Sequence, residues 1–410
     1  MQTSYHIIHL HLHETITLPP GTSASALYVV CWWKQIAIGE SFIEPGGQFR
    51  LAEAISPAID HYAWQQGIYP GNYKQALQTG DHAAFSEIME KVFAAYTSVN
   101  IPAMADVSVV ICTRYRPAQV EHCLQSLTKL ACVPREIVVV DNAPVNEETK
   151  KAVEKFPGVK YYAEPRPGLD IARNAGVRLA SAPVVAFIDD DVTIHPHCIY
   201  WTWITFRDAG ISAMTGLVLA ASLDTEAQVL FEKQWRFNRG YQDKLYDTTY
   251  FNSTFAQGPP VWDIGAGANM AFRKSIFEKV GYFDERLDVG AAGCNGDSEM
   301  WFRILAKGHS IAYNPRAIVS HEHRKDMQGL RKQLYGYMRG FTVAALIQQR
   351  AYSSAGYKRR VFLQLPKWYL GLIAKGFPGY KHRYATIFAE MKGMLSGLAY
   401  YRKHKKKQPF

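Results

Sequence analysis

Three consecutive aspartates, Asp189, Asp190 and Asp191, follow a short apolar segment at 184–188. Neighbouring carboxylates at the end of a buried strand repel one another unless water or a cation neutralises them. Mg²⁺ and Mn²⁺ prefer such oxygen ligands, and they need only one or two protein carboxylates when phosphate groups supply others. The triplet therefore predicts a divalent-cation site, and a solvated turn is the simpler alternative.

A second acidic residue, Asp297, lies far from the triplet in the sequence, just before a segment whose apolar residues have helical spacing. An aspartate in this position can simply cap the helix. A carboxylate held in a cleft beside a substrate hydroxyl can instead accept the hydroxyl proton as a general base. Further on, His321 and His323 follow a short strand predicted at 317–320, where they can bind a metal ion or form part of an ordinary surface.

Alternating strands and helices are predicted to bring these segments together. From Val107 onward the sequence predicts strands at 107–112, 137–140, 159–162 and 184–188, and helices at 117–130, 146–156 and 169–180. This alternation is typical of a doubly wound α/β sheet, in which ligands bind beyond the carboxyl ends of the strands. Thr113 and Arg114 follow the first strand, and Asp141 follows the second, where its carboxylate can accept hydrogen bonds from a base or a ribose.

Residues 1–105 have a different pattern. The segment 26–43 alternates and is rich in β-forming residues, which predicts a hairpin or a small sheet, and 49–64 and 82–96 have helical apolar spacing. Residue types that carry out catalysis do not cluster here. We therefore expect a small α+β accessory region.

Six segments of the chain together resemble the family 2 glycosyltransferases, which have the glycosyltransferase A (GT-A) fold. They are VSVVICTRYRP, IVVVDNAP, PGLDIARNAG, VVAFIDDDV, GAGANMAFRKSIFEKVGYFDERL and GDSEMWFRILAKGHSIAYNPRAIVSH. The resemblance covers roughly residues 106–325. It implies a GT-A-like, mixed and mostly parallel sheet at 106–325, preceded by the accessory region 1–105 and followed by a helical extension at 326–410.

The resemblance also implies roles for individual residues. Thr113, Arg114 and Asp141 would contact the nucleoside, and Arg173 and Asn174 match an Ala-Arg-Asn element near the nucleotide. Asp191 would bind the metal within an Asp-x-Asp motif, with Asp189 or Asp190 directed toward the ribose. His321 matches a later histidine that can complete the metal and diphosphate site, and His323 is the second choice. Asp297 matches the catalytic base, but Gly296 stands where the family usually has an acidic residue.

These residues imply an inverting, metal-dependent glycosyltransferase that uses Mn²⁺ or Mg²⁺. A sugar would pass from a nucleoside-diphosphate sugar, with UDP-sugars favoured, to a hydroxyl of a glycan or lipid-linked acceptor in polysaccharide biosynthesis. One base without a second nucleophilic carboxylate is typical of a single displacement, hence of inversion. Two alternatives are a haloacid-dehalogenase-like phosphohydrolase, whose Asp-x-Asp motif the triplet also satisfies, and a non-catalytic sugar-binding scaffold.

An aromatic-rich segment at 222–262 can form an acceptor-side loop, because sugar rings stack on aromatic faces, although aromatic residues more often fill cores. Its aromatic residues are Trp235, Phe237, Tyr241, Tyr246, Tyr250, Phe251 and Trp262. The glycine-rich stretch 265–269 lacks the setting of a dinucleotide-binding loop, but its backbone can approach a sugar closely.

The charge is unevenly distributed. From Arg324 to Phe410 there are 19 Lys and Arg residues and two acidic residues, a net charge of +17, so the remainder carries −7 of the total of +10. Basic residues in this tail alternate with Trp, Tyr, Phe and Leu, which is typical of a membrane-surface segment. A packed helical extension is the alternative, and nucleic-acid binding is not expected because no recognised module accompanies the charge.

The cysteines and the hydropathy indicate the cellular compartment of the protein. Six cysteines occur without a Cys-x-x-Cys pair, which suits reduced thiols better than a disulfide framework or a zinc site. No run of 18 or more apolar residues and no secretory signal can be read from the sequence. We therefore expect a cytoplasmic protein that is peripheral on the inner face of the cell membrane.

Overall fold

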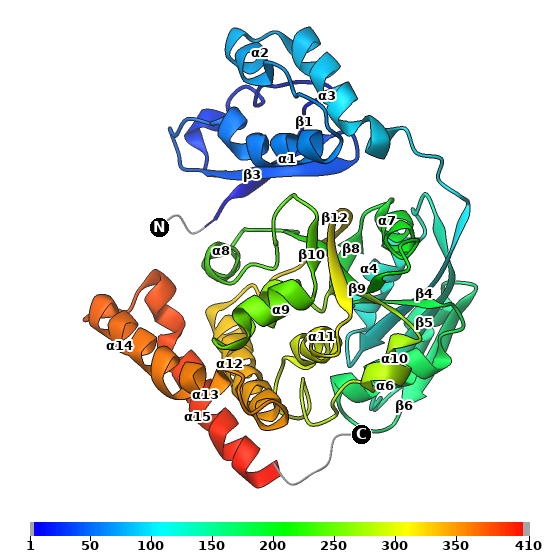
Figure 1. The fold of residues 1–410 in the computed structure, drawn as a ribbon, viewed down its shortest axis with the longest axis vertical. Helices are drawn as coiled ribbons and strands as arrows, with labels where there is room; N and C mark the ends of the chain where they lie inside the picture. The colour runs from blue at the N-terminus through cyan, green and yellow to red at the C-terminus, as the bar shows by residue number, and fades with distance from the viewer. Residues whose placement is uncertain (1–3, 405–410) are drawn as a thin grey trace.

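The computed structural model describes residues 4–404 (Figure 1). A small sheet with three helices lies at the top of the view, a large sheet with its helices fills the middle, and helices of the C-terminal region lie along the lower left. This order of a small α+β region, an α/β sheet and a helical extension agrees with the fold class predicted from the sequence.

The N-terminal sheet has β2 (Leu27–Trp33) at its centre. This strand pairs in parallel with β1 (His6–His11) and in antiparallel with β3 (Ile36–Ile43), so the predicted hairpin is confirmed. The helices α1 (Leu51–Gln65), α2 (Tyr73–Thr79) and α3 (His82–Thr97) cover one face of the sheet. The opposite face presents Tyr28 and Trp32, which pack against apolar residues of the central sheet such as Leu219.

The central sheet has nine strands within residues 4–404, in the order β10-β12-β9-β11-β7-β4-β5-β6, and β8 pairs with β12. The strands are β4 (Met104–Thr113), β5 (Val133–Asn142), β6 (Val159–Glu164), β7 (Val184–Ile188), β8 (Val192–Ile194), β9 (Ile211–Ala220), β10 (Lys244–Tyr246), β11 (Asn269–Arg273) and β12 (Ser310–His321). Strands β4, β5, β6, β7, β9 and β12 run in one direction, and β8, β10 and β11 run in the other. The sheet is therefore mixed and mostly parallel.

Apolar side chains on alternate residues of the strands build a core on each face of this sheet. On β4, Val110 faces a core that includes α6 (Leu169–Leu179) and α11 (Gly296–Ala306), whereas Val109 and Ile111 face a core that includes α4 (Pro117–Leu127) and α7 (Cys198–Thr205). The remaining helices around the sheet are α5 (Glu148–Glu154), α8 (Glu226–Gln234), α9 (Thr248–Phe255) and α10 (Ile276–Val280).

The strand predicted at 317–320 is longer in the structure, where β12 begins at Ser310. The sequence conceals its first half because Asn314, Pro315 and Arg316 interrupt the apolar pattern. The register of β12 against β9 also shifts between Asn314 and Ile318. Even so, β12 ends at His321, beside the carboxyl end of its parallel neighbour β9.

The C-terminal region consists of α12 (Met327–Ala351), α13 (Tyr357–Arg359), a π-helical segment (Arg360–Gln364), α14 (Leu365–Gly376) and α15 (Ile387–His404). Glu390 on α15 is fully buried and bonds to Arg383, Thr386 and the hydroxyl of Tyr369 on α14. At this point α14 and α15 are therefore packed against each other. Within residues 4–404, no helix has the length and apolarity needed to cross a membrane.

Candidate active site

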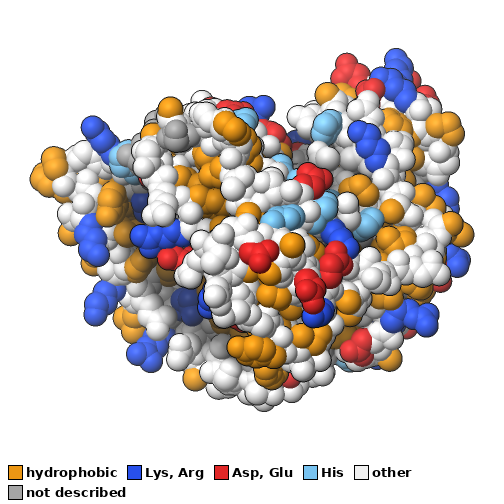
Figure 2. Space-filling view, turned by 90° about the horizontal axis from the view of Figure 1, so that it is seen from above, with side chains coloured by type: hydrophobic (Ala, Val, Ile, Leu, Met, Phe, Trp, Pro, Cys, Tyr) orange, Lys and Arg blue, Asp and Glu red, His pale blue; other side chains and the backbone are white. Residues whose placement is uncertain are grey.

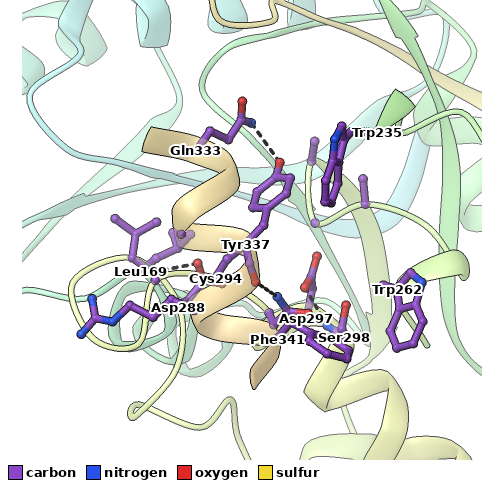
Figure 3. Close-up of a pocket in the computed structure, with 18 of the residues that line it drawn as sticks. Leu169, Trp235, Trp262, Asp288, Cys294, Asp297, Ser298, Gln333, Tyr337 and Phe341 are labelled. Carbon is purple, nitrogen blue, oxygen red and sulfur yellow. Dashed lines mark hydrogen bonds between the residues drawn. The ribbon is translucent and has the colours of Figure 1, made fainter. Parts of the chain in front are cut away.

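A cavity of about 1340 Å³ opens at the carboxyl edge of the central sheet, and residues far apart in the sequence line it. Asp189, Asp190 and Asp191 follow β7, His321 ends β12, and Asp297 lies in the first turn of α11. Figure 3 shows Asp297 in this cavity together with Trp235, Trp262 and Tyr337 of the surrounding wall. The predicted metal and base residues therefore face one space.

The three aspartates have different partners. Asp190 is buried, and its oxygens accept hydrogen bonds from Thr113 Oγ1 at 2.6 Å and from Arg116 Nη1 at 2.9 Å. Asp191 also pairs with Arg116, at 3.2 Å, and its other oxygen lies 3.2 Å from His321 Nε2. Asp190 is thus used to tie the ends of β4 and β7 together, while Asp189 and Asp191 flank the cavity.

Asp189, Asp191 and His321 form a cluster that can hold a metal ion, since one ligand atom from each lies within 4.8 Å of the others. Burial and the adjacent Asp191 charge raise the pKa of Asp189 to about 7. Burial opposes ionisation of Asp191 too, but His321, Arg116 and Arg324 hold its pKa below the usual range. Two close carboxylates repel each other when both are ionised, and a cation between them would relieve that repulsion, so these oxygen donors with one imidazole nitrogen fit Mn²⁺ or Mg²⁺.

A buried chain of polar groups continues behind His321. Its Nδ1 lies 3.0 Å from Nδ1 of His323, and His323 Nε2 lies 2.8 Å from Glu232 Oε2 on α8. Burial lowers the pKa of His323. His321 therefore faces the cluster, and His323 lies behind it.

Asp297 is held close to the backbone at two places. Its Oδ1 accepts a hydrogen bond from the amide of Ser298 at 2.6 Å, and its Oδ2 is so near Gly267 that a Cβ atom there would lie 2.9 Å away. Burial raises the pKa of Asp297, and the charge of Arg173 opposes that shift. A raised pKa brings a carboxylate closer to the range in which it works as a base.

Arg173 lies near Asp297 and is almost completely buried. It pairs with Asp170 at 3.0 Å and with Asp288 at 2.6 Å. Asp288 adopts a left-handed backbone conformation, with φ of 62°, which is uncommon for a residue other than glycine. The carboxylates of Asp170 and Asp288 are thus committed to Arg173.

Asp170 also explains why residue 296, directly before Asp297, is a glycine. A Cβ atom at Gly296 would overlap the Asp170 carboxylate, so no longer side chain fits there while Asp170 keeps this position. Burial and the charge of Asp288 hold the pKa of Asp170 well above its usual range, and its Oδ2 has no hydrogen-bond partner. A carboxyl group from α6 therefore occupies the space beside Asp297.

Only some of the residues predicted to contact the nucleotide line the cavity. Thr113, Arg114 and Arg173 line the cavity, whereas Asp141 and Asn174 do not. Asn174 uses its amide to bond the backbone of Phe283 in both directions, at 2.9 and 3.0 Å. Asp141 accepts from Tyr161 at 3.0 Å, and its buried Oδ1 has no partner.

The opposite wall comes from the segment around 235–262 and from the helices after residue 324. It contributes aromatic rings and cations: Trp235, Phe237, Trp262, Phe341, Trp368, Arg239, Arg324, Lys332, Arg339 and Arg360. The other aromatic residues of the predicted acceptor loop lie elsewhere. Phe251 packs in the core, and Tyr241, Tyr246 and Tyr250 bond to Glu40, Asp263 and Pro260.

Sequence reasoning missed Arg116, Asp170, Asp288 and Glu232. Arg116 stands in the TRYRP segment, three residues after Thr113, so its closeness to a predicted nucleotide contact could have identified it. The other three are isolated acidic residues in loops and helices, and only the folded chain brings them to the site.

Residues 108–281 match the family described as Glycosyl transferase family 2. A pre-mycofactocin glycosyltransferase of Mycobacterium tuberculosis is 25% identical over 239 residues, which cover 57% of this chain and 47% of that protein. This chain therefore spans about half the length of that relative. A glucosyl-dolichyl phosphate glucuronosyltransferase of Haloferax volcanii is 24% identical over 236 residues, 53% of this chain and 69% of that one.

Among solved structures, a mannosyltransferase of Pyrobaculum calidifontis in complex with GDP-Man and Mn²⁺ is similar, with a TM-score of 0.45 and 16% identity. The alignment covers 75% of this chain and 91% of that one.

Proposed function

We propose that this protein is an inverting, metal-dependent glycosyltransferase with Asp297 as its general base, and the match of residues 108–281 to glycosyl transferase family 2 supports the proposal. The donor is a nucleoside-diphosphate sugar, with UDP-sugars favoured, and the acceptor is a hydroxyl of a glycan or lipid-linked saccharide. The observation that carries the proposal is the convergence of Asp297 and the Asp189, Asp191 and His321 cluster on one cavity.

Asp297 has the features that a general base needs. It borders the cavity, its neighbours fix its position, and its pKa is raised by burial while Arg173 keeps ionisation accessible. In the reaction, Asp297 takes the proton of the acceptor hydroxyl as the oxygen attacks the anomeric carbon. The nearby carboxylates of Asp170 and Asp288 are paired with Arg173, which supports a single displacement and inversion over a covalent glycosyl intermediate.

Asp189, Asp191 and His321 would hold the divalent cation, which supplies positive charge against the departing diphosphate. Arg116 holds Asp190 and Asp191 in place, so the cluster keeps its geometry. Thr113 and Arg114, at the end of β4, are the residues proposed to contact the nucleoside, whereas Asp141 on β5 does not line the cavity.

The wall opposite the base supports an acceptor with sugar rings and a negative group. Aromatic faces can stack on sugars, and Arg239 and Arg360 bond to backbone carbonyls or lie over Trp262. Such cations remain able to attract phosphate. The Haloferax volcanii relative is named a glucosyl-dolichyl phosphate glucuronosyltransferase, and this name agrees with a phosphate-linked lipid acceptor.

The same wall supports attachment to a membrane surface. The segment 360–377 contributes Gln364, Leu365 and Trp368 to the cavity, and it also exposes Phe362, Leu363, Leu370 and Phe377. Figure 2 shows hydrophobic and basic side chains mixed at the left edge of the molecule, where the C-terminal helices lie in Figure 1. A lipid-linked acceptor held in the membrane could reach the cavity beside this segment.

The experiment that tests the proposal is a screen of nucleotide-sugars for thermal stabilisation in the presence and absence of Mn²⁺. A ligand that binds only the folded state, at a concentration 100 times its Kd, raises the free energy of unfolding by about 2.7 kcal/mol. We expect one class of nucleotide-sugar to stabilise the protein with Mn²⁺, and we expect Asp191→Asn to remove the effect of the metal.

Asp106→Asn is the matched control, because Asp106 pairs with Arg135 in a half-exposed ion pair. A separate activity assay distinguishes the phosphohydrolase alternative. Hydrolysis of a generic phosphate ester with Mg²⁺, without release of nucleoside diphosphate from any sugar donor, would contradict the proposal.

A further inference from the structure

The chain Asp191, His321, His323 and Glu232 links three segments of the protein through side chains alone. Asp191 follows β7, the two histidines are at and just beyond the end of β12, and Glu232 is on α8. The contacts are 3.2 Å from Asp191 Oδ1 to His321 Nε2, 3.0 Å between the two Nδ1 atoms, and 2.8 Å from His323 Nε2 to Glu232 Oε2. Each distance is that of a hydrogen bond.

The far end of this chain fixes which nitrogen atoms carry protons. A carboxylate can only accept, so His323 donates to Glu232 from Nε2. The other nitrogen of a neutral His323, Nδ1, must then accept. His321 therefore donates from its own Nδ1, and its Nε2, which lies 3.2 Å from Asp191 Oδ1, is the nitrogen whose proton a metal ion would replace.

The surroundings hold the two rings in this arrangement. His323 and Glu232 are each almost fully buried, and the His323 ring lies 4.6 Å from the ring of Phe231. The ring of Phe237 lies 5.1 Å from that of His321, edge to face. Burying two imidazoles and a carboxylate is costly compared with burying apolar side chains of the same size, so stability alone gives no reason for the chain.

We propose that Glu232 and His323 are positioning residues that hold His321 in the tautomer whose Nε2 can bind a divalent cation. The inference depends on the metal site of the proposed function, and it adds two residues that would touch neither metal nor substrate. Outer residues that orient a metal-binding histidine in this way commonly change metal affinity by about 10- to 100-fold.

The test is the Kd for Mn²⁺, measured by calorimetry or by electron paramagnetic resonance, without donor or acceptor. Glu232→Gln keeps the size of the side chain, but its amide can donate to His323 as well as accept from it, so both tautomers become accessible. We expect Glu232→Gln to weaken Mn²⁺ binding by about tenfold or more. Glu226→Gln is the matched control on the same helix, because the Glu226 side chain is 42% accessible and faces away from this chain, toward His382, and its Kd should equal that of the wild type.

A second measurement reads the tautomer itself. In the metal-free wild type, the imidazole ¹⁵N shifts of His323 should identify Nε2 as the protonated nitrogen and Nδ1 as the acceptor. This result is independent of whether a variant folds, and a purely structural role for Glu232 would not require it.

Protonation of His323 at Nδ1 in the metal-free protein would overturn the inference, as would an unchanged Mn²⁺ Kd in folded Glu232→Gln. If the wild type binds Mn²⁺ and Asp191→Asn does not, the proposed metal site stands even when the inference fails. If the wild type binds no Mn²⁺ at all, both are wrong.

Discussion

Arg173 organises the acidic centre at the scale of single residues. The sequence predicts a contact with the nucleotide, and the structure adds a second task, because Arg173 pairs with Asp170 and Asp288 and opposes the effect of burial on Asp297. A buried carboxylate without such a cation would stay protonated and could not accept a proton. Arg173 thus favours the ionised form of Asp297, while Asp170 fills the space that an acidic side chain at position 296 would need.

Gly296→Ala tests this close approach of α6 and α11. The added Cβ would overlap the Asp170 carboxylate, so the two helices must shift apart. Overpacking of this kind costs typically about 1–3 kcal/mol, and we expect that loss in urea unfolding.

Gly371→Ala on α14 is the control, because nothing lies within 4 Å of a Cβ there. It should be neutral or stabilising by up to about 1 kcal/mol, since alanine favours the helix over glycine. Equal stability of Gly296→Ala and the wild type would show that Asp170 does not occupy this space in solution.

At the scale of elements, the segment 360–377 has two surfaces. One surface closes the cavity with Trp368, and the other exposes Leu363 and Leu370, which are 65% and 66% accessible. Tyr369, between them, is buried and bonds to Glu390 of α15, so the segment is anchored and its exposed residues keep a fixed direction.

We expect the double variant Leu363→Ser and Leu370→Ser to lose binding to anionic vesicles. Each leucine contributes about 1.5–3 kcal/mol on full burial, so membrane affinity should fall by at least tenfold. The measurement is co-sedimentation with anionic and with neutral vesicles. Leu245→Ser, at an exposed leucine on β10, is the control and should bind like the wild type. Equal binding of the double variant and the wild type, or no preference for anionic vesicles, would contradict the membrane role of this segment.

Much of the fold can be predicted at this scale, because β7 is a short, continuous apolar run and β5 contains one at 137–140, each followed by polar residues. The residues proposed to bind the metal are also predictable, since Asp189 and Asp191 directly follow the apolar run of β7 and His321 follows the predicted strand at 317–320. Glu232 and Asp170 are not predictable, because each is a single acidic residue inside a helix, and its role depends on contacts with segments far away in the sequence. The first half of β12 was not predicted, because Asn314, Pro315 and Arg316 interrupt its apolar pattern.

At the scale of the whole molecule, the N-terminal region is joined to the elements that surround the site. Lys233, next to Glu232 on α8, donates to the hydroxyl of Tyr5 at 2.6 Å. Arg316 on β12 contacts the hydroxyl of Tyr62 at 3.1 Å, and Tyr28 and Trp32 pack against the central sheet. These contacts support α8 and β12 from behind, so we propose a structural role for residues 1–105 rather than a separate activity.

The central claim is that Asp297 works with a metal site contributed by distant segments, and the most direct test is the turnover of Asp297→Asn. With the donor that the nucleotide-sugar screen identifies, and at saturating Mn²⁺, we expect turnover to fall by about 10² or more, as for loss of a general base. The Kd of the donor should stay close to that of the wild type, because Asp297 is not a metal ligand. Turnover near that of the wild type in folded Asp297→Asn would contradict the account.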